Sequence, residues 1–230
     1  MILDTQGLDG SDPIVQSDPG VPQVAGLDSS RQAVLDKLWR LWSSRRARNA
    51  LLDVYYDGHR SLQDLGISVP PQMTRVRAAL AWPFKAVQSL ARKHVFEGFS
   101  LDGDTDPFDL SPLLAHNSFD LELSQGITSA YKHCCSFITC TLGDPSAGDP
   151  EVVLQARDAL WSAALWDRRR RQISAALTIT DVSKDAPSAA VLYLPDDVIA
   201  LERGAAGSWV ARSLGNPTGR VLVEPLVYDP

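Results

Sequence analysis

The sequence predicts an α+β fold, with N-terminal helices, one of them long, followed by a mainly antiparallel β-sheet region. Three observations support this prediction. Helical periodicity covers residues 31–58, residues 110–133 also have a helical pattern, and short β-type segments separated by turns fill the chain from about residue 161. Helices and strands that are segregated along the chain are typical of α+β proteins.

The composition is that of an ordinary globular protein and argues against two kinds of partner. Of the 230 residues, 44% are hydrophobic and 22% are charged, and the net charge is −6. This charge argues against bulk attraction to nucleic acid or to an anionic membrane. No apolar run approaches the roughly 20 residues of a spanning helix, and the N-terminus lacks the basic start and apolar core of a signal peptide. We therefore expect a protein made in the cytoplasm.

Residues 1–29 are expected to form a flexible acidic arm. The first 30 residues contain five Asp and no Lys or Arg, and Pro13, Pro19 and Pro22 interrupt any periodicity. Such a composition favours a segment that becomes ordered only against a neighbour.

The long helix is predicted to begin at a cap provided by Ser29 or Ser30 and to end at Gly58. Its apolar residues fall near one face: Leu35, Leu38, Trp42, Leu52, Tyr55 and Tyr56. A helix with such a face is expected to pack against the rest of the protein.

A connector, a second helix and a strand are expected next. Residues 67–73, ISVPPQM, indicate a turn or an extended connector. Pro83 suits the first position of a helix that follows Trp82. The apolar stripe of this helix contains Phe84, Val87, Leu90 and Ala91. From His94 to Phe99 the side chains alternate between two faces, which predicts a strand.

Residues 102–109, DGDTDPFD, are interpreted as a polar turn that caps the next helix. The alternating aspartates resemble the start of a calcium loop, but Pro107 and Leu113 occupy the places of its glycine and glutamate. Residues 110–133 are predicted to be helical in two pieces, and Gly126 allows the second piece to pack closely.

The rest of the chain is predicted to form short strands. Residues 134–142, CCSFITCTL, are rich in branched and aromatic residues. Residues 167–172, DRRRRQ, fit a tight hairpin connection. The alternative is a single helix over residues 155–177, because that stretch has few helix breakers; we favour strands from about residue 161.

Two basic clusters are candidate contact sites. The first lies in the middle of the long helix and consists of Arg45, Arg46 and Arg48. The second lies in the predicted hairpin connection and consists of Arg168, Arg169, Arg170 and Arg171. Each is either a solvated surface, as charge runs usually are, or a contact with an acidic neighbour. For the helical cluster, phosphate is a further alternative.

No part of the sequence is a credible active site. His133 and Cys134 are adjacent, but adjacent residues at a helix end or in a strand do not face each other. The three cysteines, Cys134, Cys135 and Cys140, are expected to pack as small apolar residues. The four histidines fall in no paired metal motif, and the glycine motifs of nucleotide-binding proteins are absent. We therefore expect no catalytic residues, no cofactor and no metal.

The order of several phrases resembles a known family. The phrase LLDVYYDG contains Tyr55, Tyr56 and Gly58, and WPFKAVQSLARKHVFEGF contains Trp82, Pro83, Glu97, Gly98 and Phe99. The final phrase NPTGRVLVEPLVYDP contains Gly219, Arg220, Val221, Val223, Pro225, Leu226 and Pro230. Together, over residues 31–230, they resemble the N-terminal half of the portal protein of long-tailed double-stranded-DNA bacteriophages, especially those that infect actinobacteria. Tyr228 and Asp229 depart from the Asn-Arg that is usual there.

The resemblance implies a structural subunit of the virion, assembled in the host cytoplasm. Such a subunit forms a homo-oligomeric ring of about twelve copies at one capsid vertex. Its partners are the capsid protein, the terminase and the head–tail adaptor, and double-stranded DNA passes through the ring without sequence-specific binding. We expect three regions: the arm (1–29), a helical wing region with short strands (30–142), and an antiparallel β region (143–230) that is cut before the stem.

Two other functions stay open from the sequence. One is another head–tail morphogenesis protein of the phage. The other, from a different class, is a small cytoplasmic hydrolase or transferase that uses His133 with Cys134 or Cys135. Thiol reactivity distinguishes the two classes, since a buried structural cysteine resists alkylation until the protein unfolds.

Overall fold

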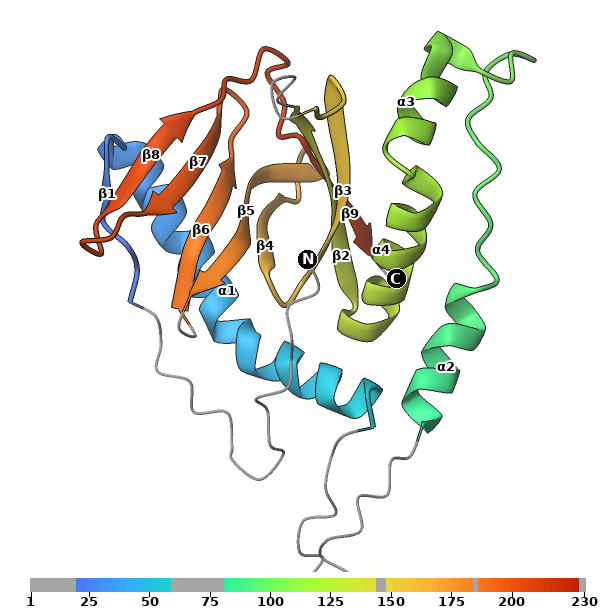
Figure 1. The fold of residues 1–230 in the computed structure, drawn as a ribbon, viewed down its shortest axis with the longest axis horizontal. Coiled ribbons are helices and arrows are strands. Elements are labelled where there is room, and N and C mark those ends of the chain that lie inside the picture. The colour runs from blue at the N-terminus through green and yellow to red at the C-terminus, as the bar shows by residue number, and fades with distance from the viewer. Residues whose placement is uncertain (1–19, 59–80, 144–147, 184–185, 228–230) are drawn as a thin grey trace, which may run out of the picture.

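The computed structural model describes residues 20–58, 81–143, 148–183 and 186–227, which form an α+β fold (Figure 1). The helices are α1 (Ser29–Tyr56), α2 (Trp82–Ala91), α3 (Leu110–His116) and α4 (Phe119–His133), with a 3-10 turn at Pro107–Asp109. The strands are β1 (Val24–Ala25), β2 (Cys135–Leu142), β3 (Val152–Asp158), β4 (Ser162–Asp167), β5 (Gln172–Ser183), β6 (Ala186–Tyr193), β7 (Val198–Arg203), β8 (Trp209–Ser213) and β9 (Val223–Val227). The predicted fold class is confirmed. The first nineteen residues of the arm, the connector 67–73 and the last three residues lie outside the described ranges.

The described strands form two sheets. The larger has the order β1-β8-β7-β6-β5-β4, and its strands β4 to β8 form the expected antiparallel meander. Strand β1 adds to its edge in parallel with β8. The smaller sheet has the order β3-β2-β9 and is antiparallel throughout. The small sheet therefore contains strands from both predicted regions. Strand β2 belongs to the predicted helical region (30–142), whereas β3 and β9 belong to the predicted β region (143–230).

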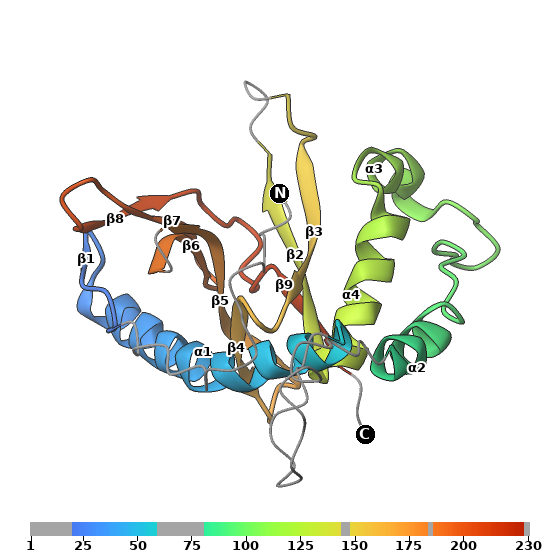
Figure 2. The same ribbon diagram turned by 60° about the horizontal axis from the view of Figure 1, so that its bottom comes forward.

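Two hydrophobic clusters arrange the fold in layers. In the first cluster α1 covers one face of the large sheet, with Leu35 and Trp39 packed among Leu177, Leu192 and other sheet residues (Figure 1). The second cluster lies between the sheets and contains Phe137 of the small sheet and Tyr193 of the large one. Helix α4 contacts β2 and β3, and α2 lies beside α4 (Figure 2). The layers are therefore α1, large sheet, small sheet and α4.

Helix α1 forms where the sequence predicts it, but its cap is Asp28 rather than Ser29 or Ser30. The Asp28 carboxylate accepts hydrogen bonds from the backbone N–H groups of Ser30 and Arg31, at 2.9 and 3.0 Å. An aspartate at this position satisfies two free donors of the first turn and also suits the positive end of the helix dipole. At the other end Gly58 adopts a positive φ of 70°, as a helix-terminating glycine does.

The expected apolar face of α1 is buried in its N-terminal half and only partly buried toward its C-terminal end. Leu35, Leu38 and Trp42 are buried, whereas Tyr55 is 40% exposed. Trp39, which the pattern missed, is also buried and stacks edge-on against Trp42 at 5.4 Å between ring centroids. In the last turns Leu52 and Tyr56 are half-buried, and the ring of Tyr56 packs against Phe84 of α2 at 5.3 Å between centroids.

The predicted strand from His94 to Phe99 is wrong, because the backbone there is irregular. Phe96 packs edge-on against Phe99 and Phe119, at 5.4 and 5.3 Å between centroids, whereas Val95 is 76% exposed. Phe96 is therefore the centre of an aromatic cluster that joins this segment to α4. Among the described strands none pairs with this segment, and an unpaired extended segment gains no ladder hydrogen bonds.

Several further local predictions are confirmed. Residues 110–133 form the two helices α3 and α4, and the Asp106 carboxylate accepts from the backbone N–H of Ser111 at 2.8 Å, so the acidic turn does cap α3. Residues 167–172 join β4 to β5 as a hairpin, which makes the alternative helix over 155–177 wrong. Gly126 permits the close approach of α4, because a Cβ there would lie 2.9 Å from Cδ1 of Leu226.

Candidate functional site

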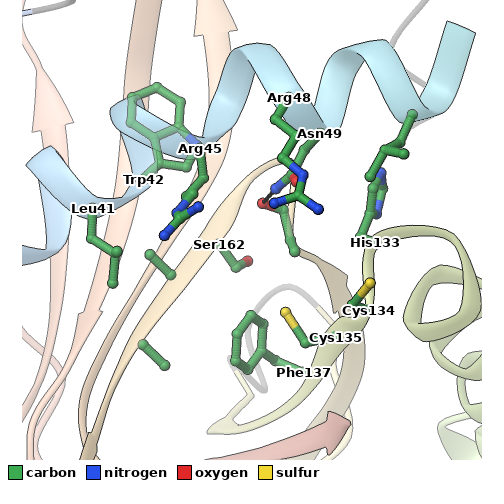
Figure 3. Close-up of a pocket in the computed structure, with 14 residues that line it drawn as sticks. Leu41, Trp42, Arg45, Arg48, Asn49, His133, Cys134, Cys135, Phe137 and Ser162 are labelled. Carbon is green, nitrogen blue, oxygen red and sulfur yellow. Dashed lines mark hydrogen bonds between the residues drawn. The ribbon is translucent and has the colours of Figure 1, made fainter. Parts of the chain in front are cut away.

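A groove of about 270 Å³ lies between the second half of α1 and the sheets. Helix α1 supplies Arg45, Arg48 and Asn49, the end of α4 and the start of β2 supply His133 to Cys135, and β4 supplies Ser162. The apolar part of the lining consists of Leu41, Trp42, Leu52, Phe137, Ala159, Ala163 and Ala164. In Figure 3 the guanidinium groups of Arg45 and Arg48 point from α1 into the space above Ser162 and Cys135.

Two buried hydrogen bonds hold α1 over the connection between β3 and β4. The Nε1–H of Trp42 donates to the carbonyl of Leu160 at 2.8 Å, and the side-chain amide of Asn49 donates to the carbonyl of Ala159 at 2.7 Å. Because both donors are buried, losing either acceptor would leave a polar group unsatisfied. These bonds fix the separation between α1 and the connection between β3 and β4, which borders the groove.

The three arginines predicted as one cluster have two different environments. Arg46 lies over the rings of Trp42 and Trp161, at 5.4 and 5.1 Å, and is half-buried. Arg45 and Arg48 are exposed at the groove and form no ion pair with a carboxylate among the described residues. Arg46 is thus part of the packing, and the other two leave positive charge at the edge of an apolar groove.

His133 is not available to activate a thiol. Its Nε2 lies 3.1 Å from Oδ1 of Asp53, which can only accept, so Nε2–H donates. Its Nδ1 lies 3.3 Å from the hydroxyl of Ser129. Both ring nitrogens are therefore occupied, and the histidine joins α4 to α1.

The cysteines differ from one another in burial. Cys134 is exposed, at a positive φ of 69° where α4 ends, so its expected burial is wrong. Cys135 and Cys140 are half-buried, and burial raises the pKa of both thiols. The neighbouring Cys134 raises the pKa of Cys135 further. A raised thiol pKa disfavours the thiolate that a nucleophilic cysteine needs.

A small charge cluster lies beside the groove. Burial alone would raise the pKa of the Asp53 carboxyl, but hydrogen bonds from His133 and Lys132 outweigh it and hold the pKa below its usual value. Nearby, burial raises the pKa of the Asp158 carboxyl although His133 and a backbone N–H oppose the shift. Two carboxyls of one cluster therefore have opposite shifts, since Asp53 alone hydrogen-bonds to the two basic side chains.

The second basic cluster is not part of the groove lining. Arg168 to Arg171 form the exposed turn between β4 and β5. The Asp167 carboxylate accepts from the backbone N–H groups of Arg169 and Arg170, at 2.9 and 3.1 Å, which fixes the turn. Its Oδ2 also lies 4.0 Å from Nε of Arg170, whose side chain stays largely exposed. The four arginine side chains therefore extend into solvent.

The chain was compared with known protein families and with curated proteins. No protein-family model matches the chain. The portal protein of Mycobacterium phage L5 is 33% identical over 162 residues, which cover 67% of this chain and 33% of that protein. The portal protein of Mycobacterium phage D29 is 33% identical over 163 residues, with 68% and 33% coverage. The chain is similar to phage portal proteins.

This similarity confirms the resemblance inferred from the order of the sequence phrases. The chain spans about a third of the length of the curated portal proteins that it matches. Among the helices that the structure describes, none combines the length and apolarity that crossing a membrane requires.

The sequence indicated the arginines of this portal-like chain but missed the residues that organise its groove. Asp53 and Ser129 are ordinary helix-surface residues in the sequence, and neither stands near His133 in a recognisable motif. The structure brings Asp53 to His133 across 80 positions. Only the packing of α1 against α4 could have indicated that contact.

Proposed function

We propose that the chain is part of a phage portal subunit, corresponding to the wing region of the ring at the capsid vertex through which DNA is packaged and ejected. The observation that carries this proposal is the 33% identity to two portal proteins over 67% and 68% of the chain. The α+β fold is consistent with it. The proposed role is structural, without catalysis or cofactor.

The proposal also covers the partners of the subunit and its location in the virion. The subunit forms a homo-oligomeric ring of about twelve copies, contacts the capsid protein, the terminase and the head–tail adaptor, and resides in the virion. The net charge of −6 supports a passage for DNA that does not hold it. Each phosphate that a channel neutralised would add affinity and slow the moving duplex.

Electron microscopy tests this proposal. Antibodies raised against the chain should label a single vertex of the capsid in particles of the phage that encodes it. The protein purified from those particles should form rings with a central channel. Labelling at every vertex, or along the tail, would contradict the proposal and indicate a capsid or tail protein instead.

The turn between β4 and β5 is proposed as one side of a ring contact. A cyclic ring needs two different complementary surfaces on each subunit. Arg168 to Arg171 are exposed, and a suitable counterpart is the exposed acidic loop that contains Asp102, Asp104 and Asp109. Replacing the four arginines with serine should weaken ring assembly and reduce its sensitivity to salt. Unchanged assembly and unchanged salt sensitivity would discard this contact.

A thiol-dependent hydrolase or transferase is not favoured. The hydrogen bonds of His133 to Asp53 and Ser129 count against it, and so does the raised thiol pKa of Cys135. An activity that disappeared in both Cys134→Ala and Cys135→Ala would reinstate it.

A further inference from the structure

Two aromatic side chains are exposed beside the oppositely charged segments of the proposed ring contact. Phe108 lies in the acidic loop and is 82% exposed, and Trp166 precedes the arginine turn and is 51% exposed. Within the described ranges neither ring packs against another aromatic ring. Exposed aromatic residues that adjoin charged ones are typical of the positions that contribute most to binding at protein interfaces.

The backbone of the acidic loop holds Phe108 at the surface. Phe108 and Asp109 both have a left-handed backbone, with φ of 63° and 53°. This conformation is unfavourable for residues other than glycine, and it is found most often at functional sites. The loop is fixed around Phe108, because the Asp104 carboxylate accepts from the N–H of Asp106 at 3.0 Å and the Asp106 carboxylate accepts from the N–H of Ser111 at 2.8 Å. A ring presented from a fixed loop loses little conformational entropy when it binds.

Trp166 is exposed because it lies at the end of an edge strand. In the described part of the chain β4 is the last strand of the large sheet. Trp166 shares a face of β4 with Ala164, which packs against the second hydrophobic cluster. The pairing of β4 with β5 shifts by one residue between Leu165 and Trp166, and such an irregularity changes the direction of the side chain beside it. The ring therefore adjoins Arg168 to Arg171 at the surface.

The two surfaces are complementary in charge and lie in different parts of the fold. Among the described residues Asp102 and Asp109 form no ion pair, and the arginine turn forms only the contact of Arg170 with Asp167. The acidic loop precedes α3, whereas the arginine turn ends β4 of the large sheet (Figure 1). One subunit therefore offers the two surfaces to two different neighbours, as a ring requires.

We propose that Phe108 of one subunit packs against Trp166 of the next, and that this aromatic pair is the apolar centre of the ring contact. The pair rests on the proposed function and specifies how neighbouring subunits of that ring meet. Exposed ion pairs contribute little individually and are screened by salt. Two aromatic rings bury a large apolar area that salt does not screen. The aspartates and arginines then surround the rings and fix their orientation.

The protein concentration at which half of the full chain is assembled, measured by mass photometry, tests the pair. Phe108→Ala and Trp166→Ala should each raise that concentration at least about tenfold. The double variant should raise it no more than about twofold beyond either single variant, because one substitution already removes the contact. Trp82→Ala, at a 77% exposed tryptophan of α2, is the matched control and should change it by less than about twofold. Effects that multiply, or effects no larger than the control's, would overturn the proposal.

A mixture of the two single variants tests the head-to-tail geometry. Phe108 remains in the Trp166→Ala subunit and Trp166 remains in the Phe108→Ala subunit, so one intact contact can form between them. The mixture should therefore contain dimers that neither variant forms alone, and a mixture with no new species would contradict the pairing. The urea midpoints of both variants should equal the parent's, because both side chains are exposed. A lower midpoint would assign the ring to the subunit's own core, contrary to the proposal.

Salt dependence separates failure of the aromatic pair from failure of the proposed function. High sodium chloride should weaken assembly of the parent but leave the effect of Phe108→Ala unchanged, since screening acts on the charges. Rings that assemble equally well with and without Phe108 would discard the pair and leave the portal function standing. A parent chain that forms no ring would contradict the proposed function and the pair together.

Discussion

Asn117 pairs with the backbone of β3 around Leu154 as a neighbouring strand would. Its side-chain amide donates to the carbonyl of Val152 at 2.9 Å, and its side-chain oxygen accepts from the N–H of Leu154 at 2.8 Å. In the first turn of α4, Glu122 accepts from the N–H of Ala156 at 2.5 Å. Strand β3 is an edge of the small sheet, and these side chains close an edge that could otherwise pair with another chain.

Asn117→Ala should therefore destabilise the protein by about 1–3 kcal/mol, because two backbone groups lose their partner. Urea unfolding gives the free energy, and light scattering reports the expected self-association through the opened edge. Gln125→Ala, at an exposed position of the neighbouring helix α4, is the control and should change the free energy by less than about 0.5 kcal/mol. Equal effects of the two variants would show that the edge contact contributes nothing specific.

Asp53→Asn should cost about 1–3 kcal/mol at neutral pH, because the carboxylate loses its charged contacts with Lys132 and His133. The folded pKa of Asp53 lies below the ordinary value of 3.8, so its stabilisation is present above pH 3.8 and is lost as the pH falls through the lower folded pKa. The difference between variant and parent should consequently shrink below that value. Unfolding free energies measured across the acid range check this, and a constant difference would contradict it.

Asp158→Asn should behave in the opposite way. Burial raises the pKa of Asp158 above 3.8, so ionisation costs stability in the folded state at neutral pH. The neutral amide avoids that cost and keeps an oxygen to accept from the N–H of Trp161, at 3.1 Å in the present structure. We expect the variant to be as stable as the parent or more stable at pH 7 by up to about 1 kcal/mol. Thermal unfolding of the Asp53→Asn and Asp158→Asn variants at pH 7 tests this difference. A similar loss of stability in both variants would contradict it.

Gly126 should tolerate alanine but not leucine. A Cβ there meets Cδ1 of Leu226 at 2.9 Å, and this methyl can move because it is the end of a flexible side chain. Alanine also gains about 1 kcal/mol of helix propensity, so the net change should be small. Leucine has no such space and should cost about 1–3 kcal/mol by overpacking. Combining it with Leu226→Ala should recover part of that loss; absence of coupling would show that the strain lies elsewhere.

Arg46→Gln should lower stability by about 0.5–1 kcal/mol, since the guanidinium lies over the rings of Trp42 and Trp161. Arg45→Gln, one residue earlier, should have almost no effect on unfolding because its side chain is exposed. Chemical denaturation of the two variants provides the comparison. Equal losses would mean that the two arginines share one environment, contrary to the structure.

The sequence by itself determined what depends on neighbours along the chain. The periodicity of residues 31–58 predicted α1 and the burial of Leu35, Leu38 and Trp42, and β-type runs with turn residues predicted the meander. The order of those phrases also indicated the similarity to portal proteins. These features are local, because helix and strand periods are properties of the backbone itself.

Tertiary structure alone decided the contacts between distant segments. Nothing local distinguishes the alternation of residues 94–99 from a strand. A strand fails there because none of the strands in the described ranges pairs with it. Similarly, Arg46 differs from Arg45 only because Trp161 lies beneath one of them, and His133 meets Asp53 only because α4 packs against α1. A hydrogen-bond ladder, a cation–π contact and a groove each require surfaces that folding brings together.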